Sequence, residues 1–283
     1  MKIIYSPKCL EYKSFNHPES PERVKICVDF LKEKGFEFIQ PQPAKEKDLL
    51  LVHTQRLIDE VKNGKISDLD TPNIKGIFNY ALLSVGGAIL AMEKALQGEN
   101  SFSLMRPPGH HAGKDFCGGF CYFNNIAIAV AKAEKRVKKV AILDIDCHHG
   151  NGTEDIFLGK SNVLYVSLHE SPLYPGTGLK SYLNCKNFPL PPKTDEIKYL
   201  KTLEIALKEI ENFQPDLLAI SAGFDTYKKD PLTYFGLEIE SYQKIGEKIS
   251  QLKLPTFCVL EGGYSTSLPF CLYNFLLGLE YAS

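Results

Sequence analysis

The feature that most constrains this chain is a regular alternation of short apolar segments with longer amphipathic ones. The short segments are rich in β-branched and aliphatic residues, and they predict strands at 2–6, 101–106, 138–146, 162–169, 215–223 and 255–263. The longer segments predict helices at 20–35, 77–98, 125–136, 195–213, 238–252 and 268–280. This alternation predicts an α/β fold with a mostly parallel central sheet and helices on both faces.

The 283 residues contain no Ser/Gly-rich linker, low-complexity tract or internal repeat. The loops that hold proline and glycine also hold isolated polar residues, which is typical of one domain with long functional loops. We therefore expect residues 1–283 to form a single domain. Open parallel sheets bind ligands outside the carboxyl ends of their strands, so we expect the functional site there.

Charge and hydropathy exclude several classes of partner. The formal net charge is −1, from 33 Lys and Arg against 34 Asp and Glu, so no global positive field would hold nucleic acid or an anionic membrane. No apolar stretch approaches the roughly 18 residues of a membrane span, and the apolar core at the N-terminus is too short for a signal peptide. The 8 cysteines include no C-x-x-C pair, which indicates reduced thiols in a cytoplasmic protein.

The predicted strand at 138–146 runs into the sequence DIDCHHG, where ionisable residues are unusually dense. If the strand continues, side chains alternate between its faces, and Asp144, Asp146 and His148 share one face. Cys147 and His149 then point the other way. Two buried carboxylates would repel each other, whereas a divalent cation would bind both of them together with the imidazole. A hydrogen-bonded Asp/His network without metal is the alternative.

A catalytic metal site needs a third protein ligand from elsewhere in the chain. Asp225 lies two residues beyond the predicted strand at 215–223, on the same expected edge of the sheet. An isolated Asp in such a position is often only a turn former or a helix cap. Its matching location nevertheless makes Asp225 the candidate third ligand beside Asp146 and His148.

Two further segments place reactive side chains at the same edge. His110 and His111 follow the predicted strand at 101–106 in a loop stiffened by prolines, and imidazoles near a metal are candidates for acid–base catalysis. Tyr264 follows the predicted strand at 255–263, and its hydroxyl could stabilise an oxyanion. Each residue alone has an ordinary explanation, as a surface histidine or a half-buried aromatic. Together with the two acidic strand ends they predict an active site.

Successive motifs of the chain resemble those of the zinc-dependent histone deacetylase superfamily, which includes acetylpolyamine amidohydrolases and acetoin-utilisation proteins. The motifs are RPPGHHA, GGFCYFNNIAIA, DIDCHHGNGTEDIF, VSLHE, YPGTG, SAGFD and EGGY. They occur in the family's order between His17 and Tyr264. HPESPERV and RPPGHHA are more similar to the class II and acetylpolyamine branches than to class I. The resemblance implies an arginase-like deacetylase fold.

The resemblance also implies a zinc-binding set and a catalytic set. The residues that match the family's zinc ligands are Asp146, His148 and Asp225. His110 and His111 match its tandem histidines, and Asp144 and Asn151 match the partners of these histidines. Tyr264 matches the tyrosine that polarises the substrate carbonyl. Of the tandem histidines, the second is implied to be the general base and acid.

A structural potassium site and a substrate tunnel are implied in the same way. The residues that match the potassium site are Asp144, Asp146, His148, Ser167 and Leu168. Asp70 matches the acid at the rim of the tunnel. Gly119, Phe120 and Tyr174 match the tunnel walls, and Leu232 matches the tunnel mouth. His149 is then a structural histidine.

The implied activity is hydrolysis of an acyl group, most simply acetyl, from an amine, with zinc or ferrous iron as the metal. In the family, a glutamate at the position of Leu232 accompanies a preference for acetylpolyamines. Because Leu232 offers only apolar contact, the resemblance favours an acyl-lysine substrate. Acetylpolyamine is the alternative, since Glu19 and Glu22 could bring negative charge to the entrance. A two-metal ureohydrolase and a non-hydrolytic acyl-binding module are more distant alternatives. The sequence leaves the oligomeric state open.

Overall fold

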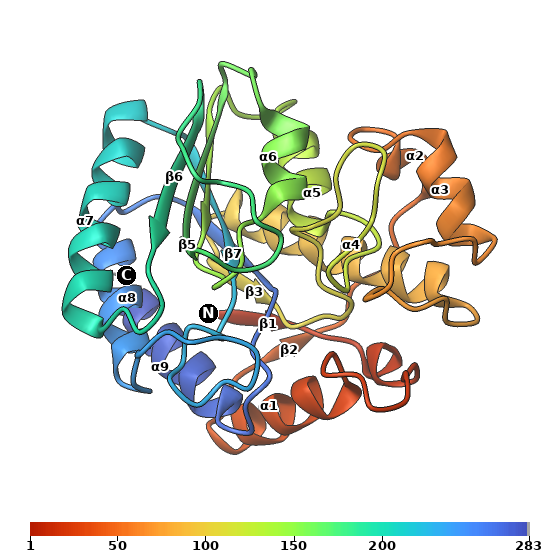
Figure 1. The fold of residues 1–283 in the computed structure, drawn as a ribbon, viewed down its shortest axis with the longest axis horizontal. Coiled ribbons are helices and arrows are strands. Elements are labelled where there is room, and N and C mark those ends of the chain that lie inside the picture. Colours follow the sequence, from red (N-terminus) through yellow and green to blue (C-terminus); the bar gives the residue numbers. More distant parts are fainter. Residues whose placement is uncertain (282–283) are drawn as a thin grey trace.

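The structure is a computed structural model that describes residues 1–281. One sheet lies at the centre of the molecule, with its strands in the order β2-β1-β3-β8-β7-β4-β5-β6 (Figure 1). Neighbouring strands run parallel throughout it. The strands are β1 (Lys2–Ile4), β2 (Phe38–Ile39), β3 (Ser101–Ser103), β4 (Val140–Asp144), β5 (Val163–Glu170), β6 (Cys185–Leu190), β7 (Leu217–Ala222) and β8 (Thr256–Leu260).

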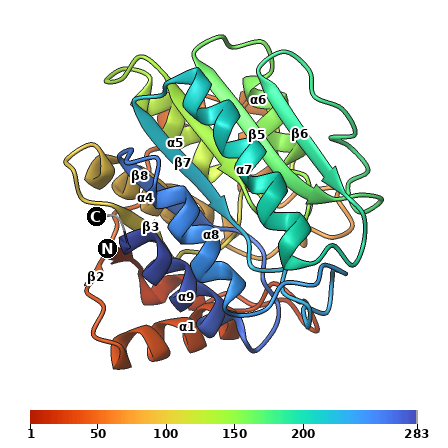
Figure 2. The same cartoon turned by 90° about the vertical axis from the view of Figure 1, so that its left-hand side faces the viewer.

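Helices cover both faces of this sheet, which confirms the predicted fold class. The helices on one face, which lie side by side in Figure 2, are α1 (Pro21–Glu33), α7 (Glu196–Phe213), α8 (Ser241–Ser250) and α9 (Leu268–Glu280). The helices on the other face are α2 (Glu46–Leu49), α3 (Gln55–Lys62), α4 (Ile77–Ala95), α5 (Asn125–Ala133) and α6 (Asn151–Phe157). A short 3-10 helix, η1 (Pro7–Leu10), follows β1.

Strand β4 contributes to the apolar cores on both faces of the sheet. Its residues Ala141 and Leu143 pack in the core beneath α7 and α8, whereas Val140 and Ile142 pack in the core beneath α4 and α5. Every residue of β4 is buried. A strand enclosed on both sides is therefore continuously apolar rather than alternating, and this is the pattern that predicted it.

The predicted strands and helices all occur, but some boundaries differ and several short elements were not predicted. Strand β3 ends at Ser103 rather than at 106, and β4 ends at Asp144 rather than at 146. Elements β2, β6, α2, α3 and α6 are additional to the prediction. Strand β6 contains Pro189, but β6 lies at the end of the sheet, where a missing N–H is tolerated.

Among the helices of residues 1–281, none combines the length and the apolar character that a bilayer span requires. The eight cysteines all lie in this part of the chain and are free thiols. Apart from Cys117, which is half-buried, these thiols are buried.

Candidate active site

The loops that follow β3, β8, β7 and β4 meet at one edge of the sheet, because these strands are adjacent and parallel. The predicted catalytic and metal-binding side chains lie on these loops, and they are His110, His111, Asp146, His148, Asp225 and Tyr264. This is the carboxyl edge, where ligands of open parallel sheets bind. Residues far apart in the sequence are thus brought to one place by the topology alone.

The expectation that Asp144, Asp146 and His148 share one face of a strand is wrong, because β4 ends at Asp144. Asp144 Oδ1 accepts the backbone N–H of Asp146 (3.2 Å), and Asp146 Oδ1 accepts the backbone N–H of His148 (2.8 Å). Each carboxylate therefore bonds to the backbone two residues further on, which makes two successive Asx turns. These turns, and not a strand, shape the segment that carries the three residues.

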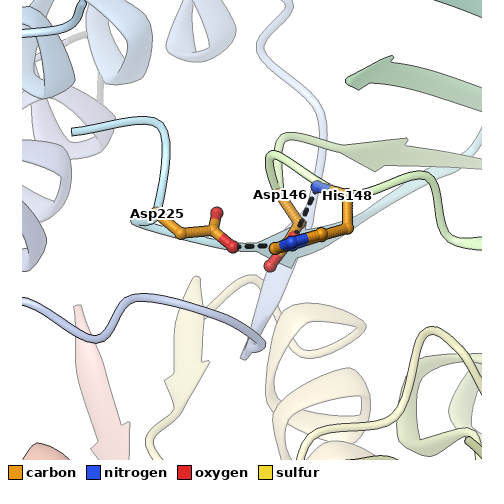
Figure 3. Close-up of side chains that lie close together, drawn as sticks. All are labelled: Asp146, His148 and Asp225. Carbon is orange, nitrogen blue, oxygen red and sulfur yellow. Dashed lines mark hydrogen bonds and ion pairs between the residues drawn. The ribbon is translucent and has the colours of Figure 1, made fainter. Parts of the chain in front are cut away.

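Asp146, His148 and Asp225 form the cluster shown in Figure 3. Each offers one potential ligand atom, and these atoms all lie within 4.8 Å of one another. Nδ1 of His148 lies 3.1 Å from Asp146 Oδ1 and 2.9 Å from Asp225 Oδ2. Both carboxylates are fully buried. The structure thus brings together the three residues that the sequence predicted as metal ligands.

The residues of this cluster fit a bound cation. Asp225 Oδ1 accepts the N–H of Cys147 (2.8 Å), whereas its buried Oδ2 lies 2.9 Å from Nδ1 of His148, outside hydrogen-bond geometry. Burial and the nearby charge of Asp146 raise the pKa of Asp225, because two ionised carboxylates are costly side by side. A divalent cation would remove this cost, and two carboxylates with one imidazole suit zinc and other first-row metals.

The two adjacent histidines have opposite pKa shifts. His110 Nδ1 lies 3.0 Å from Asp144 Oδ2. Burial alone would lower the pKa of His110, but the carboxylates of Asp144 and Asp146 outweigh burial and raise it to about 10. For His111, burial and the neighbouring imidazoles of His110 and His148 lower the pKa. Environments that push two pKa values apart are typical of acid–base sites.

His111 is held by the first residue of α6. Its Nδ1 lies 2.8 Å from Oδ1 of Asn151, and an amide oxygen only accepts hydrogen bonds. Nδ1 therefore carries the hydrogen, and Nε2 keeps its lone pair. The ring of His111 lies edge-on to the ring of Tyr174, with 5.1 Å between their centroids.

Tyr264 is held by two backbone hydrogen bonds, at Gly262 and at its own N–H, and by a contact to its ring. The N–H of Gly262 donates to Asp146 Oδ2 (2.7 Å), and the N–H of Tyr264 donates to Asp230 Oδ2 (2.7 Å). The guanidinium of Arg23 lies 4.5 Å from the centroid of the tyrosine ring. Burial, partly opposed by Arg23, raises the pKa of Tyr264 well above its usual value. The hydroxyl therefore keeps its proton near neutral pH.

A cavity of about 400 Å³ opens over the cluster. The predicted residues that line it are Asp70, His110, His111, Gly119, Phe120, Asp146, His148, Tyr174, Leu232 and Tyr264. Gly119 has a φ of 53°, and a Cβ there would lie 2.4 Å from Cδ2 of His111, so the position requires glycine. The five predicted substrate residues thus share one cavity with the histidine pair.

The predicted potassium residues also lie close together. Asp144 and Ser167 are direct partners across β4 and β5, and Leu168 is the next residue along β5. All three are fully buried. His149, expected to be structural, is buried and bonds away from the cluster, with Nδ1 2.7 Å from the hydroxyl of Thr177.

The idea that Glu19 and Glu22 bring negative charge to the entrance is not supported by their contacts. Glu19 is buried, and its carboxylate accepts from Arg106 at 2.6 and 2.8 Å and from Arg23 at 3.3 Å. Glu22 forms an exposed ion pair with Lys13 at 2.9 Å. Both charges are therefore already balanced by cations of the chain.

Two other carboxylates lie at the mouth of the cavity. Asp70 lines it, and Asp68 lies beside it, since a Cβ on Gly118 would be 3.4 Å from both Asp68 Oδ1 and the hydroxyl of Tyr174. Across residues 1–281, neither aspartate forms an ion pair with a Lys, Arg or His side chain. Leu69, between them, is 98% exposed. The mouth thus presents two acidic groups around one exposed apolar side chain.

Sequence reasoning missed three residues that support the site. Tyr165 donates its hydroxyl to Asp144 Oδ2 (3.0 Å), and Asp230 holds the backbone of Tyr264. Glu261, the residue after β8, is a fully buried carboxylate, and burial raises its pKa to about 7. An ionisable residue at the end of an apolar strand is the signal that identifies Asp225, and it identifies Glu261 as well.

The chain is similar to known proteins along most of its length. A family model for the histone deacetylase domain matches residues 17–275. "Probable deacetylase" of Archaeoglobus fulgidus is 39% identical over 299 aligned residues, covering 95% of this chain and 83% of that protein. "Acetylpolyamine amidohydrolase 1" of Pseudomonas aeruginosa is 40% identical over 230 aligned residues, which cover 76% of this chain and 66% of that protein. The crystal structure of the HDA15 HD domain has a TM-score of 0.93 and 29% identity, covering 100% of this chain and 92% of that chain.

The parallel sheet with helices on both faces, together with these matches, defines a hydrolase that acts on amide bonds and has a deacetylase-type fold. The family model spans most of the chain. The chain therefore belongs to the histone deacetylase family. The prediction of the family, of its fold and of the enzyme class is confirmed.

Proposed function

We propose that this protein is a metal-dependent deacylase that removes an acetyl or other short acyl group from an amine. One observation carries the proposal above all. The buried cluster of Asp146, His148 and Asp225 lies at the cavity that His111 and Tyr264 line. A cation site, a neutral imidazole and a protonated phenol at one cavity are the groups that amide hydrolysis requires.

The proposed ligands of the metal are Asp146, His148 and Asp225, and the proposed metals are Zn²⁺ and Fe²⁺. Three protein ligands leave at least one position open, as catalytic sites require. When bound, such a cation lowers the pKa of a water molecule and polarises the acyl carbonyl. The mixed nitrogen and oxygen donors suit both metals.

The side chains perform the proton transfers in this proposal. His111 is neutral with a free lone pair on Nε2, so it accepts a proton from water as the water oxygen attacks the acyl carbon. The hydroxyl of Tyr264 donates a hydrogen bond to the carbonyl oxygen as negative charge develops on it. His111 then passes its proton to the leaving amine. His110, bonded to Asp144, orients the carboxylates beside it. The products are a carboxylate and a free amine.

The proposed substrate is an acylated amine with a slender aliphatic stem, most simply an acyl-lysine. Gly119, Phe120 and Tyr174 form walls that suit such a stem, because two rings face it and the glycine leaves space. Leu232 at the mouth adds apolar contact and no charge. Burial of apolar area along the stem would stabilise binding by about 25 cal/mol per Å².

An acetylpolyamine is the second candidate substrate, and one observation favours it. Asp68 and Asp70 are acidic groups at the mouth without an ion-pair partner of their own among the described residues. A second ammonium of a polyamine would pair with them, although a peptide rich in lysine or arginine would do so too. A relative with 40% identity carries the name acetylpolyamine amidohydrolase.

Three further points stand as proposals. We expect residues 1–283 to form one domain, since strands near both ends of the chain lie in one sheet. We expect a structural K⁺ beside Asp144, Ser167 and Leu168, because these residues lie together and are buried. A cytoplasmic location is in keeping with eight free thiols.

The experiment that tests the proposal is a substrate panel on chelated and remetallated protein. Acetyl-lysine peptides, acetylated spermidine and longer acyl-lysines would be compared by kcat/KM, with zinc or ferrous iron restored after chelation. We expect hydrolysis of at least one acetylated amine, lost on chelation and recovered with metal. Full activity after complete metal removal would contradict the proposed function.

A further inference from the structure

Glu261 is a buried carboxylate that reaches the loop of the histidine pair. It follows β8, and its side chain is fully shielded from solvent. Its Oε2 accepts the backbone N–H of Gly109 (2.7 Å) and that of His110 (3.2 Å). Its Oε1 accepts the hydroxyl of Ser221 at the end of β7 (3.1 Å). One side chain therefore links the end of β7 to the loop that follows β3.

The loop that Glu261 reaches has few other ways to satisfy its backbone. The residues between β3 and α5 form no regular helix or strand, so their polar groups need individual partners. The carbonyl of His110 is bonded by the N–H of Thr153 (3.1 Å), whereas its N–H faces Glu261. Gly109 has no room for a side chain, since a Cβ there would lie 2.5 Å from the backbone nitrogen of Asn125. Both the N–H and the carbonyl of His110 are therefore hydrogen-bonded, which fixes the loop at this residue.

The residue after Glu261 is tied to the metal cluster. The N–H of Gly262 donates to Asp146 Oδ2 at 2.7 Å, and Asp146 is one of the proposed ligands. The side chain of Glu261 and the backbone of Gly262 thus point to the two halves of the site, the histidines and the ligands. This dipeptide therefore links the two halves by direct hydrogen bonds.

We infer that Glu261 is a positioning residue, which holds the His110–His111 loop at its working distance from the metal ligands by accepting the two backbone N–H groups. This inference rests on the proposed function, because it assigns His111 the acid–base step. Glu261 itself is not among the residues that line the cavity. Its effect is therefore exerted through the loop, on the geometry of His111.

The test compares Glu261→Met with Glu261→Gln. Methionine is similar in length but cannot accept the two N–H groups, which would then be buried without a partner. Glutamine can place its amide oxygen where Oε2 lies, while its NH2 group donates to the rotatable hydroxyl of Ser221. The control is Val259→Ala, at a buried residue of β8. This substitution removes side-chain volume from the core but no polar contact.

Two readouts distinguish positioning from simple loss of stability. We expect Glu261→Met to lower kcat by about 10²-fold with KM within about threefold and metal content unchanged, because acid–base catalysis contributes on that order. We expect Glu261→Gln to be at least about tenfold faster than Glu261→Met, and Val259→Ala to keep the wild-type kcat. Equal losses in the Gln and Met variants would overturn the inference, since charge and not hydrogen bonding would then matter.

Hydrogen exchange supplies a readout that is independent of activity. In the metal-free protein, the amides of residues 109 and 110 should exchange faster by about tenfold or more in Glu261→Met, because their acceptor is gone, and should stay protected in Glu261→Gln. Unchanged exchange in Glu261→Met would overturn the inference whether or not the protein is a deacylase. A wild type that hydrolyses no acylated amine, with exchange behaving as expected, would contradict the proposed function instead.

Discussion

His111 donates its Nδ1 hydrogen to Oδ1 of Asn151 across 2.8 Å, and this bond selects the tautomer of the histidine. Nε2 is then the nitrogen that can accept a proton. Because burial and two neighbouring imidazoles lower the pKa of His111, the ring is neutral at physiological pH. A neutral imidazole of defined orientation is a general base that needs no further activation.

The first prediction follows from this bond. Asn151→Leu should lower kcat by about tenfold or more, because Nδ1 loses its partner and the tautomer is no longer fixed. Asn151→Asp keeps the acceptor and adds a negative charge, which raises the pKa of His111. The acidic limb of kcat/KM should therefore move to higher pH in Asn151→Asp. A profile of kcat/KM between pH 5 and 9 checks both variants, and an unmoved limb would speak against His111 as the base.

The second prediction concerns Tyr264. Tyr264→Phe should lower kcat by about 10²-fold while metal content stays at the wild-type level, since the hydroxyl acts on the developing oxyanion and is not a ligand. Because the pKa of Tyr264 is raised, its deprotonation should cause no loss of wild-type activity below about pH 10. Metal analysis and steady-state kinetics on the same preparation provide the measurement. Near-normal turnover by Tyr264→Phe would remove the residue from the mechanism.

The third prediction concerns stability in acid and rests on His53. This residue is buried, with Nδ1 2.8 Å from the carbonyl of Gly113 and Nε2 accepting the N–H of Asn124 at 2.9 Å. Burial lowers its pKa from 6.5 to about 4. The unfolded chain therefore binds more protons between pH 6.5 and 4, and the stability due to neutral His53 is lost as pH falls through this window.

The expected loss is about 3 kcal/mol, from a shift of roughly two to three pKa units at 1.36 kcal/mol each. Urea unfolding of the metal-free protein at several pH values measures it. His53→Gln cannot titrate and should show a shallower dependence of the unfolding free energy on pH. Identical slopes for the two proteins would show that His53 is not protonated on unfolding.

The sequence predicted which residues form the site better than it predicted how they meet. Asp146, His148 and Asp225 were identified because ionisable residues after apolar strands are rare. The sequence pattern predicts that Asp146 and His148 share one face of a strand, whereas two Asx turns shape the segment that carries them. Whether a strand continues for two more residues depends on tertiary hydrogen bonds that periodicity does not reveal.

Some elements and supports had no local signal. Strand β6 carries Pro189 and polar residues and is recognisable only through its pairing with β5. Glu19 sits in a motif that suggested surface charge, yet Arg106, which lies 87 residues further on, buries and neutralises it. Contacts between such distant segments follow from the fold, so single-sequence reasoning could place the strands and could not place these partners.

The fourth prediction concerns the mouth of the cavity. Leu232→Glu adds a carboxylate to the cavity that Asp70 lines, so it should favour a substrate with a second ammonium. The ratio of kcat/KM for acetylated spermidine to that for an acetyl-lysine peptide should rise by at least about tenfold, or roughly 1.4 kcal/mol of differential transition-state binding. Leu232→Gln is the neutral control and should leave the ratio near that of the wild type. A wild type that already prefers spermidine would replace acyl-lysine by acetylpolyamine as the substrate.

The most direct test of the central claim is the metal content of Asp225→Ala. Asp225 supplies a buried carboxylate oxygen that faces His148, another proposed ligand, and its removal leaves a two-ligand site. Thr226→Val, one residue further on and also buried, serves as a control that leaves the ligands in place. After chelation and reconstitution with zinc, we expect one equivalent of metal in the wild type and in Thr226→Val, and a loss of both metal and activity in Asp225→Ala. Full metal occupancy in Asp225→Ala would contradict the assignment of Asp225 as a ligand.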